Sequence, residues 1–379
     1  MTQAQLSSLG VGAPGTEPEI FDAGTDADAG TASLPATGRR GLARARRAAP
    51  RAAPAPTRQG LPAVLERYGE LLGPALDAAV AKLHPALRPA LQHHFTGAGK
   101  RVRGALVLLS AAAVGAEEQA VVDGAVAIEL VHNFSLIHDD VIDGDEERRH
   151  RPTVWARYGL GHAIVGGDAL VLAAVELLLS EPHPARVRAA AVLAQATQAM
   201  IGGQAEDMVF EGRPAVTVDE CLTMEAGKTG ALLACAASLG AILAEAPDPV
   251  ITGLAAYGAH IGIAFQAVDD VLGIWGDPSV TGKPVGSDLL ARKRTLPVTV
   301  ALEAGGPRAA ELAELLDGPL DALDLARATV LLECGRRRSL TIAEAHVENA
   351  LAILEELELA PGPRAELVEL ARFVSRRDR

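Results

Sequence analysis

Two pairs of adjacent aspartates in apolar surroundings are the strongest chemical signal in this sequence. Asp139 and Asp140 follow the apolar pair Leu136-Ile137, and Asp269 and Asp270 follow a similar apolar run 130 positions later. Unpaired carboxylates are costly to bury, so a hard cation is the simplest compensation. Mg²⁺ takes oxygen ligands and prefers one or two carboxylates together with the phosphate oxygens of a substrate. The two pairs therefore predict a site for metal ions and a diphosphate.

Helical spacing sharpens this prediction. If both runs are helical, Asp139 and Asp143 lie on one face of the first helix, and Asp269 with Asp270 begins an acidic patch on the second. A lone aspartate pair is usually a solvated face or a helix start, but two copies in apolar context favour a metal site. A calcium loop is excluded, because Asp-x-x-Asp-Gly-Asp does not place ligands at every second position with glycine sixth.

Basic residues occur where a second, metal-free diphosphate would need them. Lys100, Arg101 and Arg103 follow a glycine-rich turn at an expected helix start, where backbone N–H groups and the helix dipole favour an anion. Arg148 and Arg149 come one loop after the first aspartate motif, and guanidinium groups bind phosphate oxygens bidentately. Each basic pair alone would be a solvated surface; a neighbouring metal site favours the binding role.

The composition predicts a helical protein that positions these residues. The chain has 379 residues, 49% of them hydrophobic but only 3% aromatic, and alternating β-branched runs are scarce. The net charge of −13 argues against a nucleic-acid partner. Three widely spaced cysteines (Cys221, Cys235 and Cys334) indicate a reducing cytoplasm without a disulfide framework.

From about Leu61 onward, apolar periodicity and turn signals predict one large all-α domain over residues 59–379. The apolar stretch 163–179 contains Asp168 and Glu176, which predicts a buried helix of the bundle and not a membrane span. The expected helices are 64–83, 103–113, 121–143, 163–179, 187–209, 219–239, 250–272 and 296–302, with several more up to Arg379.

Residues 1–58 differ in composition from the rest. They are rich in Ala, Gly, Pro, Ser and Thr, with acidic residues first and arginines after them, so we expect a disordered tail. Neither a secretory signal nor an acid-poor transit peptide fits this pattern. Short apolar spots such as Ile20-Phe21 suggest a segment that docks on a protein scaffold or shell; an inert solubilising extension is the alternative.

Taken together, the chain resembles the trans-isoprenyl diphosphate synthases (polyprenyl synthetases), most closely bacterial geranylgeranyl-type enzymes, over about Leu61 to Arg379. The motifs that carry the resemblance are Asp-Asp-x-x-Asp-x₄-Arg-Arg at 139–149, Gly-Lys-Arg-x-Arg at 99–103, Lys228-Thr229, and the later block from Gln266 through Gly282-Lys283 to Lys293. The departures are Ala98 for Gly, Gly104 for Pro, His150 for Gly, and Gly273 where the farnesyl type has a third Asp. None of them removes a charged ligand.

The resemblance implies an all-α helical bundle of the isoprenoid synthase type with a central substrate cavity. It also implies catalysis through Lys228 and the five aspartates, with three Mg²⁺ ions when substrate is bound. Without the resemblance, His132 would be interpreted as an ordinary helical histidine, and Gln266 as a buried amide with its hydrogen bonds satisfied. The implied roles are Mg²⁺ binding for Asp139, Asp143 and Asp269, supported by Asp140 and Asp270; isopentenyl diphosphate binding for Lys100, Arg103, His132 and Arg149; and allylic diphosphate binding for Arg148, Lys228, Thr229, Gln266, Lys283 and Lys293.

The expected activity is condensation of isopentenyl diphosphate with dimethylallyl, geranyl or farnesyl diphosphate by a cytoplasmic homodimer. Phe134 lies five positions before Asp139 and Ser135 four before it, a combination that in the resembled family suggests a geranylgeranyl (C20) product. The alternatives are a farnesyl or longer-chain synthase, a class I terpene cyclase, and a non-catalytic partner subunit. The cyclase needs only one diphosphate pocket, so Lys100, Arg103 and Arg149 weigh against it.

Overall fold

The structure, a computed structural model, describes residues 62–96, 99–277 and 285–376 and is almost entirely helical there, which confirms the all-α prediction. The tail at 1–58 and Lys283 lie outside the described residues. The α-helices are α2 (Ala63–Lys82), α3 (Arg88–Phe95), α4 (Val102–Ala113), α5 (Val122–Ile142), α6 (Val154–Tyr158), α7 (Leu160–Leu179), α8 (Pro184–Glu211), α9 (Val218–Glu225), α10 (Ala231–Leu243), α11 (Asp248–Trp275), α13 (Ser287–Leu290), α14 (Leu296–Glu303), α15 (Gly306–Asp317), α16 (Ala322–Leu331), α17 (Glu333–Glu356) and α18 (Pro361–Arg376).

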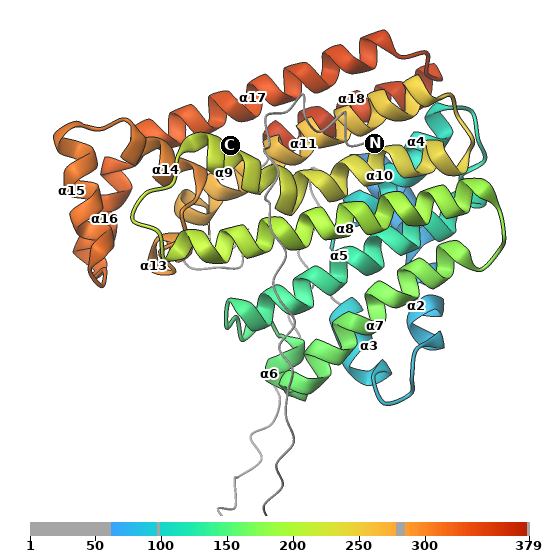
Figure 1. Cartoon of the computed structure of the whole chain (residues 1–379), viewed down its shortest axis with the longest axis horizontal. Coiled ribbons are helices and arrows are strands. Elements are labelled where there is room, and N and C mark those ends of the chain that lie inside the picture. Colours follow the sequence, from blue (N-terminus) through green and yellow to red (C-terminus); the bar gives the residue numbers. More distant parts are fainter. Residues whose placement is uncertain (1–61, 97–98, 278–284, 377–379) are drawn as a thin grey trace, which may run out of the picture. The chain divides into compact units, whose positions relative to one another are not determined.

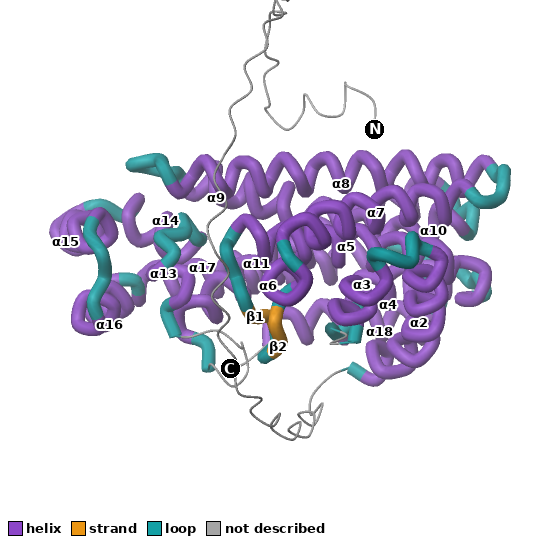
Figure 2. Tube along the Cα trace, turned by 90° about the horizontal axis from the view of Figure 1, so that it is seen from below, coloured by secondary structure: helices purple, strands orange, loops and turns teal. Residues whose placement is uncertain are grey.

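Long helices stacked side by side form the body of the fold. In Figure 1, α17, α11, α10, α8, α5 and α7 lie one below another with roughly aligned axes. The helix α10 packs between α11, α4 and α8, which makes it the centre of the bundle. The turned view in Figure 2 shows α8 running along the outside of this stack.

The small residues seen in the composition allow this close stacking. A Cβ atom on Gly240 of α10 would lie 2.0 Å from the carbonyl oxygen of Val107 in α4, so only glycine permits the two backbones to approach this closely. Aliphatic side chains such as Leu106, Ile128 and Leu239 fill the remaining interior and are almost completely buried. An Ala- and Leu-rich core therefore replaces the aromatic residues that the chain lacks.

Most predicted helices are confirmed with ends that differ by a few residues, and one prediction is wrong in kind. The range 219–239 is not one α-helix, because a π-helical turn, η3 (Ala226–Gly230), separates α9 from α10. The N–H of Ala231 bonds to the carbonyl of Ala226, five residues back. This turn carries Lys228 and Thr229.

A short hairpin follows α5. Its strands β1 (Glu147–Arg148) and β2 (Arg151–Pro152) are antiparallel, with Arg148 opposite Arg151. The two turn residues, Arg149 and His150, have positive φ angles of 54° and 60°, a conformation that is uncommon for residues other than glycine. The tight turn directs the chain back beside the end of α5.

The helix α7 corrects the prediction of a buried helix at 163–179. Within the part of the chain that the structure describes, four segments, including α7, are long and apolar enough to cross a membrane by length and composition alone, and only 33% of the α7 window is buried. Apolar residues of α7 at Leu160, Ile164, Val165 and Leu172 are exposed. Since α7 packs on α5 and α8 with its other face, it is a bundle helix with one uncovered apolar face.

Candidate active site

The first aspartate motif lies at the C-terminal end of α5. Asp140 is 1% exposed, and Nε of Arg148 from the hairpin donates to its Oδ1 at 2.6 Å. Burial nevertheless raises the pKa of Asp140 to about 6, with Arg148 opposing the increase. The other oxygen, Oδ2, is buried and has no hydrogen-bond partner among the described residues. The expected placement of a guanidinium beside the acidic face is therefore seen for Arg148.

Two further carboxylates of this motif lie close together. Asp143 is the residue that ends α5 instead of lying within it, and its N–H still bonds to the carbonyl of Asp139 at 2.8 Å. Burial raises the pKa of Asp139; the charge of Lys228 opposes this and that of Asp143 adds to it. Nζ of Lys293 donates to Oδ2 of Asp143 at 2.9 Å. Residues from α5, η3 and the segment before α14 thus meet at one place.

The second motif lies near the C-terminal end of α11 and is held by neutral groups. Asp270 is 5% exposed; it accepts hydrogen bonds from Nε2 of Gln266 at 2.7 Å and from the backbone N–H of Leu296 at 2.8 Å. Oγ1 of Thr229 donates to Oε1 of Gln266 at 2.7 Å, which extends the chain of bonds to η3. Burial raises the pKa of Asp270 to about 6.

A buried glutamate that the sequence analysis missed lies beside this network. Glu225 is 1% exposed, and burial followed by the negative charge of Asp270 raises its pKa well above the usual value. The sequence signal for this residue was an acid one turn after Cys221 on the buried side of α9. The Cys221 thiol lies 3.6 Å from Oε1 of Glu225.

Lys228 is held by a second missed acid. Its Nζ forms an ion pair of 2.5 Å with Oδ2 of Asp207 on α8, and Asp207 is 9% exposed. A Cβ on Gly203, one turn earlier in α8, would lie 2.3 Å from the backbone nitrogen of Lys228, so glycine allows η3 to press against α8. The Gly202-Gly203 pair within a helical pattern was the signal for this close approach.

The basic block is at the start of α4, as expected. Nη1 of Arg103 lies 3.2 Å from Nε2 of His132 on α5, and burial, followed by the charge of Arg103, lowers the pKa of His132. Nζ of Lys100 lies 5.2 Å from the ring centre of Phe373 on α18. The guanidinium of Arg149 packs against Gly99, the residue before Lys100. The four residues expected to bind isopentenyl diphosphate are thus brought to one region.

Arg101, in contrast, turns away from this region. It has a left-handed backbone (φ 49°), and its Nη1 donates to the carbonyl of Gly69 on α2 at 2.6 Å. His94 on α3 was missed; its Nε2 lies 3.0 Å from Oδ1 of Asn133, the neighbour of His132. Burial lowers the pKa of His94 to about 3, so it is neutral.

Asp288 of α13 occupies the place beside Gly273. A Cβ on Gly273 would lie 1.9 Å from Oδ2 of Asp288, so the carboxylate lies directly over this glycine. Gly273 is where the farnesyl-type pattern has a third aspartate. A carboxylate from another element therefore reaches the surface of α11 at this position, and a larger residue at 273 would require the Asp288 side chain to move. Asp288 was not among the site residues predicted from the sequence.

The carboxylates fit a hard divalent cation that shares its ligands with a substrate. Among the described residues, no three His, Cys, Asp or Glu side chains form a ready ligand cluster. Mg²⁺ does not require one, because it keeps waters and binds one or two carboxylates with phosphate oxygens. The charge of Asp143 raises the pKa of Asp139, a repulsion that a shared cation would relieve.

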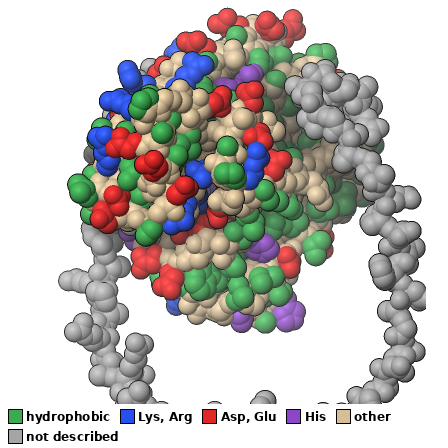
Figure 3. Space-filling view, turned by 60° about the vertical axis from the view of Figure 1, so that its left-hand side comes forward, with side chains coloured by type: hydrophobic (Ala, Val, Ile, Leu, Met, Phe, Trp, Pro, Cys, Tyr) green, Lys and Arg blue, Asp and Glu red, His purple; other side chains and the backbone are tan. Residues whose placement is uncertain are grey.

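The helices α5 and α11, which carry the two motifs near their C-terminal ends, both end toward the left-hand side of Figure 1. Figure 3 turns this side forward and shows Lys and Arg side chains interleaved with Asp and Glu. Arg148, Lys228 and Lys293 each contact a carboxylate, Lys100 and Arg103 lie beside a ring, and Arg101 contacts a backbone carbonyl. The arrangement can bind anionic groups by exchanging these internal partners.

Known proteins give an independent comparison. Residues 84–329 match the family model described as Polyprenyl synthetase. The chain is 45% identical over 336 residues to (2E,6E)-farnesyl diphosphate synthase of Mycobacterium tuberculosis (strain ATCC 25618 / H37Rv), covering 84% of this chain and 93% of that protein. It is 42% identical over 332 residues to a geranylgeranyl diphosphate synthase of the same strain, covering 83% and 94%.

A solved structure gives the same result for the fold. The crystal structure of a polyprenyl synthetase from Streptomyces coelicolor A3(2) superposes with a TM-score of 0.79 at 44% identity, over 82% of this chain and 98% of that one. The comparisons cover nearly the full length of these proteins.

Proposed function

The chain belongs to the polyprenyl synthetase family, and on that premise we propose that this short-chain trans-prenyl diphosphate synthase makes geranylgeranyl diphosphate. The reaction joins isopentenyl diphosphate to an allylic diphosphate and releases diphosphate. The observation that carries the C20 product is the pair Phe134 and Ser135 in the helix that leads into Asp139.

Asp139 on α5, Asp143 at its C-terminal end and Asp269 on α11 would hold Mg²⁺, which is typical of the family. Three ions are the proposed number. When bound, Mg²⁺ neutralises negative charge on the departing diphosphate and so favours ionisation of the allylic C–O bond. Asp140 and Asp270 support the ligands from within the fold, because both are buried and hydrogen-bonded.

Arg148, Lys228 and Lys293 would bind the allylic diphosphate. Lys228 and Lys293 now pair with Asp207 and Asp143, and Arg148 pairs with Asp140. A diphosphate entering with its cations would replace these internal partners without moving the helices. Thr229 and Gln266 would orient the same group, and Lys283 is proposed from its motif position alone.

Lys100, Arg103, His132 and Arg149 would bind isopentenyl diphosphate, whose double bond attacks the allylic carbocation. His132 is neutral, so it can donate one hydrogen bond without adding a charge. The proton lost after attack would pass to the released diphosphate. No nucleophilic side chain is needed, and apolar walls would protect the carbocation from water.

Product length would be set by Phe134. Its side chain is 8% exposed, and its ring meets that of His138 edge-on at 4.8 Å. Ser135 is small, and its hydroxyl is engaged with the carbonyl of His132 at 2.9 Å. A growing chain pushed along α5 would therefore meet the larger group at Phe134. A farnesyl (C15) product is the second candidate, favoured by the 45% identity to a farnesyl diphosphate synthase.

The test is turnover of labelled isopentenyl diphosphate with dimethylallyl, geranyl and farnesyl diphosphate, with products sized by chromatography. Wild type should stop at C20, Phe134→Ala should give longer products, and Ser135→Phe should give shorter ones. Phe95→Ala is the matched control, since Phe95 is also 8% exposed but lies on α3. Its product should be unchanged. Unchanged products in both α5 variants would contradict this chain-length assignment.

We further propose a cytoplasmic homodimer built on the helical domain 59–379. The uncovered apolar face of α7 continues onto α8, where Val187, Ile201 and Met208 are exposed. An apolar surface of this kind favours association with a second copy. Light scattering of the purified chain should give twice the monomer mass, and Leu172→Glu should lower it.

A further inference from the structure

A buried glutamate on α5 reaches the start of α4, where the basic block lies. Glu129 is 3% exposed, and its Oε1 accepts a hydrogen bond of 2.8 Å from the backbone N–H of Gly104. Gly104 is the third residue of α4, and Arg101, the cap residue, offers no side-chain acceptor to this first turn. Glu129 therefore supplies, from another helix, an acceptor that the start of α4 lacks. It has no role in the reaction proposed above.

Glycine at position 104 makes this contact possible. A Cβ atom there would lie 2.9 Å from Cγ of Glu129 and 2.7 Å from Cδ1 of Leu72, so glycine lets the glutamate approach without a shift of its neighbours. Proline, which the resembled family commonly has at this position, has no N–H to donate. The bond between Gly104 and Glu129 therefore occurs where this chain departs from the family pattern.

A second contact between the same two helices lies directly beside this bond. Arg103 precedes Gly104 in α4, and its Nη1 lies 3.2 Å from Nε2 of His132. His132 follows Glu129 by three positions in α5, so the two side chains lie on one face of that helix. The two contacts thus join α4 to α5 at neighbouring positions, and the second involves two residues proposed to bind isopentenyl diphosphate.

The charges at the start of α4 explain why an anchor is needed there. The positive end of the helix dipole disfavours cations, yet this end carries Lys100, Arg101 and Arg103. Burial raises the pKa of Glu129, and the Gly104 N–H and the charges of Arg103, Arg101 and Arg149 oppose the increase. Burial lowers the pKa of Arg149, and the charge of Glu129 opposes this. Without an acceptor at Gly104, these repulsions would favour displacement of the start of α4.

We propose that Glu129 is a positioning residue for the isopentenyl diphosphate site: by accepting the Gly104 N–H, its carboxylate fixes the start of α4 on α5 and holds Arg103 beside His132. This role rests on the proposed function, because isopentenyl diphosphate is the ligand that Arg103 and His132 would bind. Glu129 acts through Gly104 and not by contact with substrate. Its effect should be confined to this site and should leave binding of the allylic diphosphate unchanged.

Three substitutions separate positioning from charge. Glu129→Gln keeps an oxygen that accepts the Gly104 N–H but removes the charge, Glu129→Asp keeps the charge on a side chain that is too short, and Glu129→Ala removes both. Loss of negative charge alone would favour an anion, so a pure charge effect predicts tighter binding in the Gln and Ala variants. Positioning predicts binding about 10-fold weaker in the Ala and Asp variants, and within about 3-fold of wild type in the Gln variant.

The test is isothermal titration calorimetry of the full-length protein with isopentenyl diphosphate in the absence of Mg²⁺, since this site is the metal-free one. Steady-state assays with Mg²⁺ should show the same change in KM for isopentenyl diphosphate and an unchanged KM for the allylic substrate. A merely structural role would not separate the two substrates in this way.

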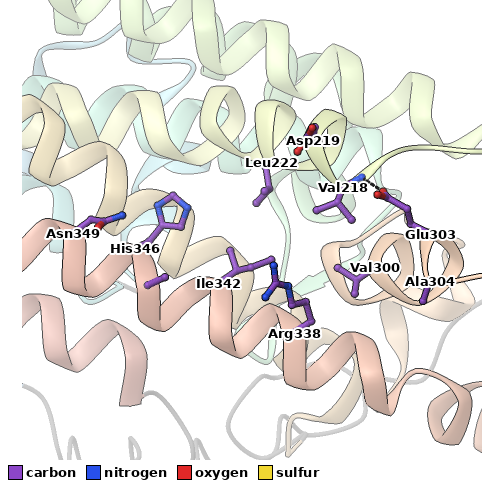
Figure 4. A pocket seen from close by; sticks show the side chains of 11 residues that line it. Val218, Asp219, Leu222, Val300, Glu303, Ala304, Arg338, Ile342, His346 and Asn349 are labelled. Carbon is purple, nitrogen blue, oxygen red and sulfur yellow. Dashed lines mark hydrogen bonds between the residues drawn. The ribbon is translucent and has the colours of Figure 1, made fainter.

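Glu303→Ala is the matched control. Oε2 of Glu303 also accepts an N–H from the first turn of another helix, that of Val218 in α9, at 2.6 Å. Figure 4 shows this bond at the open cavity between α9, α14 and α17, on elements that carry none of the residues proposed for isopentenyl diphosphate. The control should bind isopentenyl diphosphate as wild type does.

Amide hydrogen exchange gives a readout that does not depend on activity. The Gly104 N–H should exchange faster in Glu129→Ala than in wild type or Glu129→Gln, with unchanged helical circular dichroism. Unchanged binding in the Ala and Asp variants, tighter binding in the Gln and Ala variants, or equal weakening in all three would overturn the positioning role alone. Failure of wild type to bind isopentenyl diphosphate would overturn the proposed function and this role with it.

Discussion

The two aspartate motifs are similar in sequence but stabilise their buried carboxylates differently. Asp140 on α5 relies on a cation, Arg148, only eight positions later. Asp270 on α11 relies on the Gln266 amide and the N–H of Leu296, with the buried Glu225 nearby. The α5 motif is therefore a local, charged arrangement, and the α11 motif is a neutral one assembled from several elements.

This difference suggests that the two motifs, although similar in sequence, have different parts in substrate binding. A guanidinium that is 26% exposed can reach an incoming phosphate while still touching its carboxylate, so the α5 side can respond to substrate. On the α11 side, the two oxygens of Asp270 accept hydrogen bonds from Gln266 and Leu296, so this carboxylate would stay fixed. A fixed α11 motif and an adaptable α5 motif would together bind an anion that enters and leaves the site in each catalytic cycle.

The largest expected effect is on kcat, and it tests whether both aspartate motifs act in the metal site. Asp139→Ala and Asp269→Ala should each lower kcat by about 10²–10³-fold or more, since each would remove charge stabilisation from the transition state. Steady-state assays with saturating Mg²⁺ measure this, with circular dichroism to verify the fold. Near-normal turnover by either variant would remove that motif from the metal site.

A smaller effect should separate the two diphosphate sites. Lys100→Ala should raise KM for isopentenyl diphosphate by about 10–100-fold, because a hydrogen bond to a charged group contributes about 1.5–3 kcal/mol. Lys228→Ala should instead raise KM for the allylic substrate. Arg101→Ala is the control for Lys100, since Arg101 turns toward α2. Equal shifts for both substrates in both lysine variants would contradict separate sites.

The smallest expected effect is a pH-dependent change in stability. It comes from His94, which contacts Asn133 on α5. The folded pKa of His94 is about 3, against 6.5 when unfolded, so the unfolded chain takes up a proton first as pH falls. The stabilisation is fully present above pH 6.5 and is lost below it, by about 2 kcal/mol at pH 5. Urea unfolding at both pH values should show this loss, and His94→Gln should lack it. An identical pH dependence in the variant would exclude His94 as its source.

The helices were largely predictable, because apolar periodicity is a local property. The helix expected at 121–143 is Val122–Ile142, and the Asp140–Arg148 contact follows from the short loop between them. The contact of Lys293 with Asp143 spans 150 positions and depends on how distant helices pack, which no local pattern encodes. Asp207 and Glu225 were missed because a single acid in a helix looks the same whether it is exposed or buried.

The π-helical turn at Ala226–Gly230 makes this part of the chain sensitive to length as well as to sequence. A π turn holds one more residue than the α turn it replaces. Deleting one residue there would restore a regular α-helix, and the side chains within the turn would move to new positions around the helix axis. Lys228 would then leave Asp207, although α10 would keep its packing on α4 and α11. Homologous chains should therefore tolerate substitutions in this turn far better than single-residue insertions or deletions.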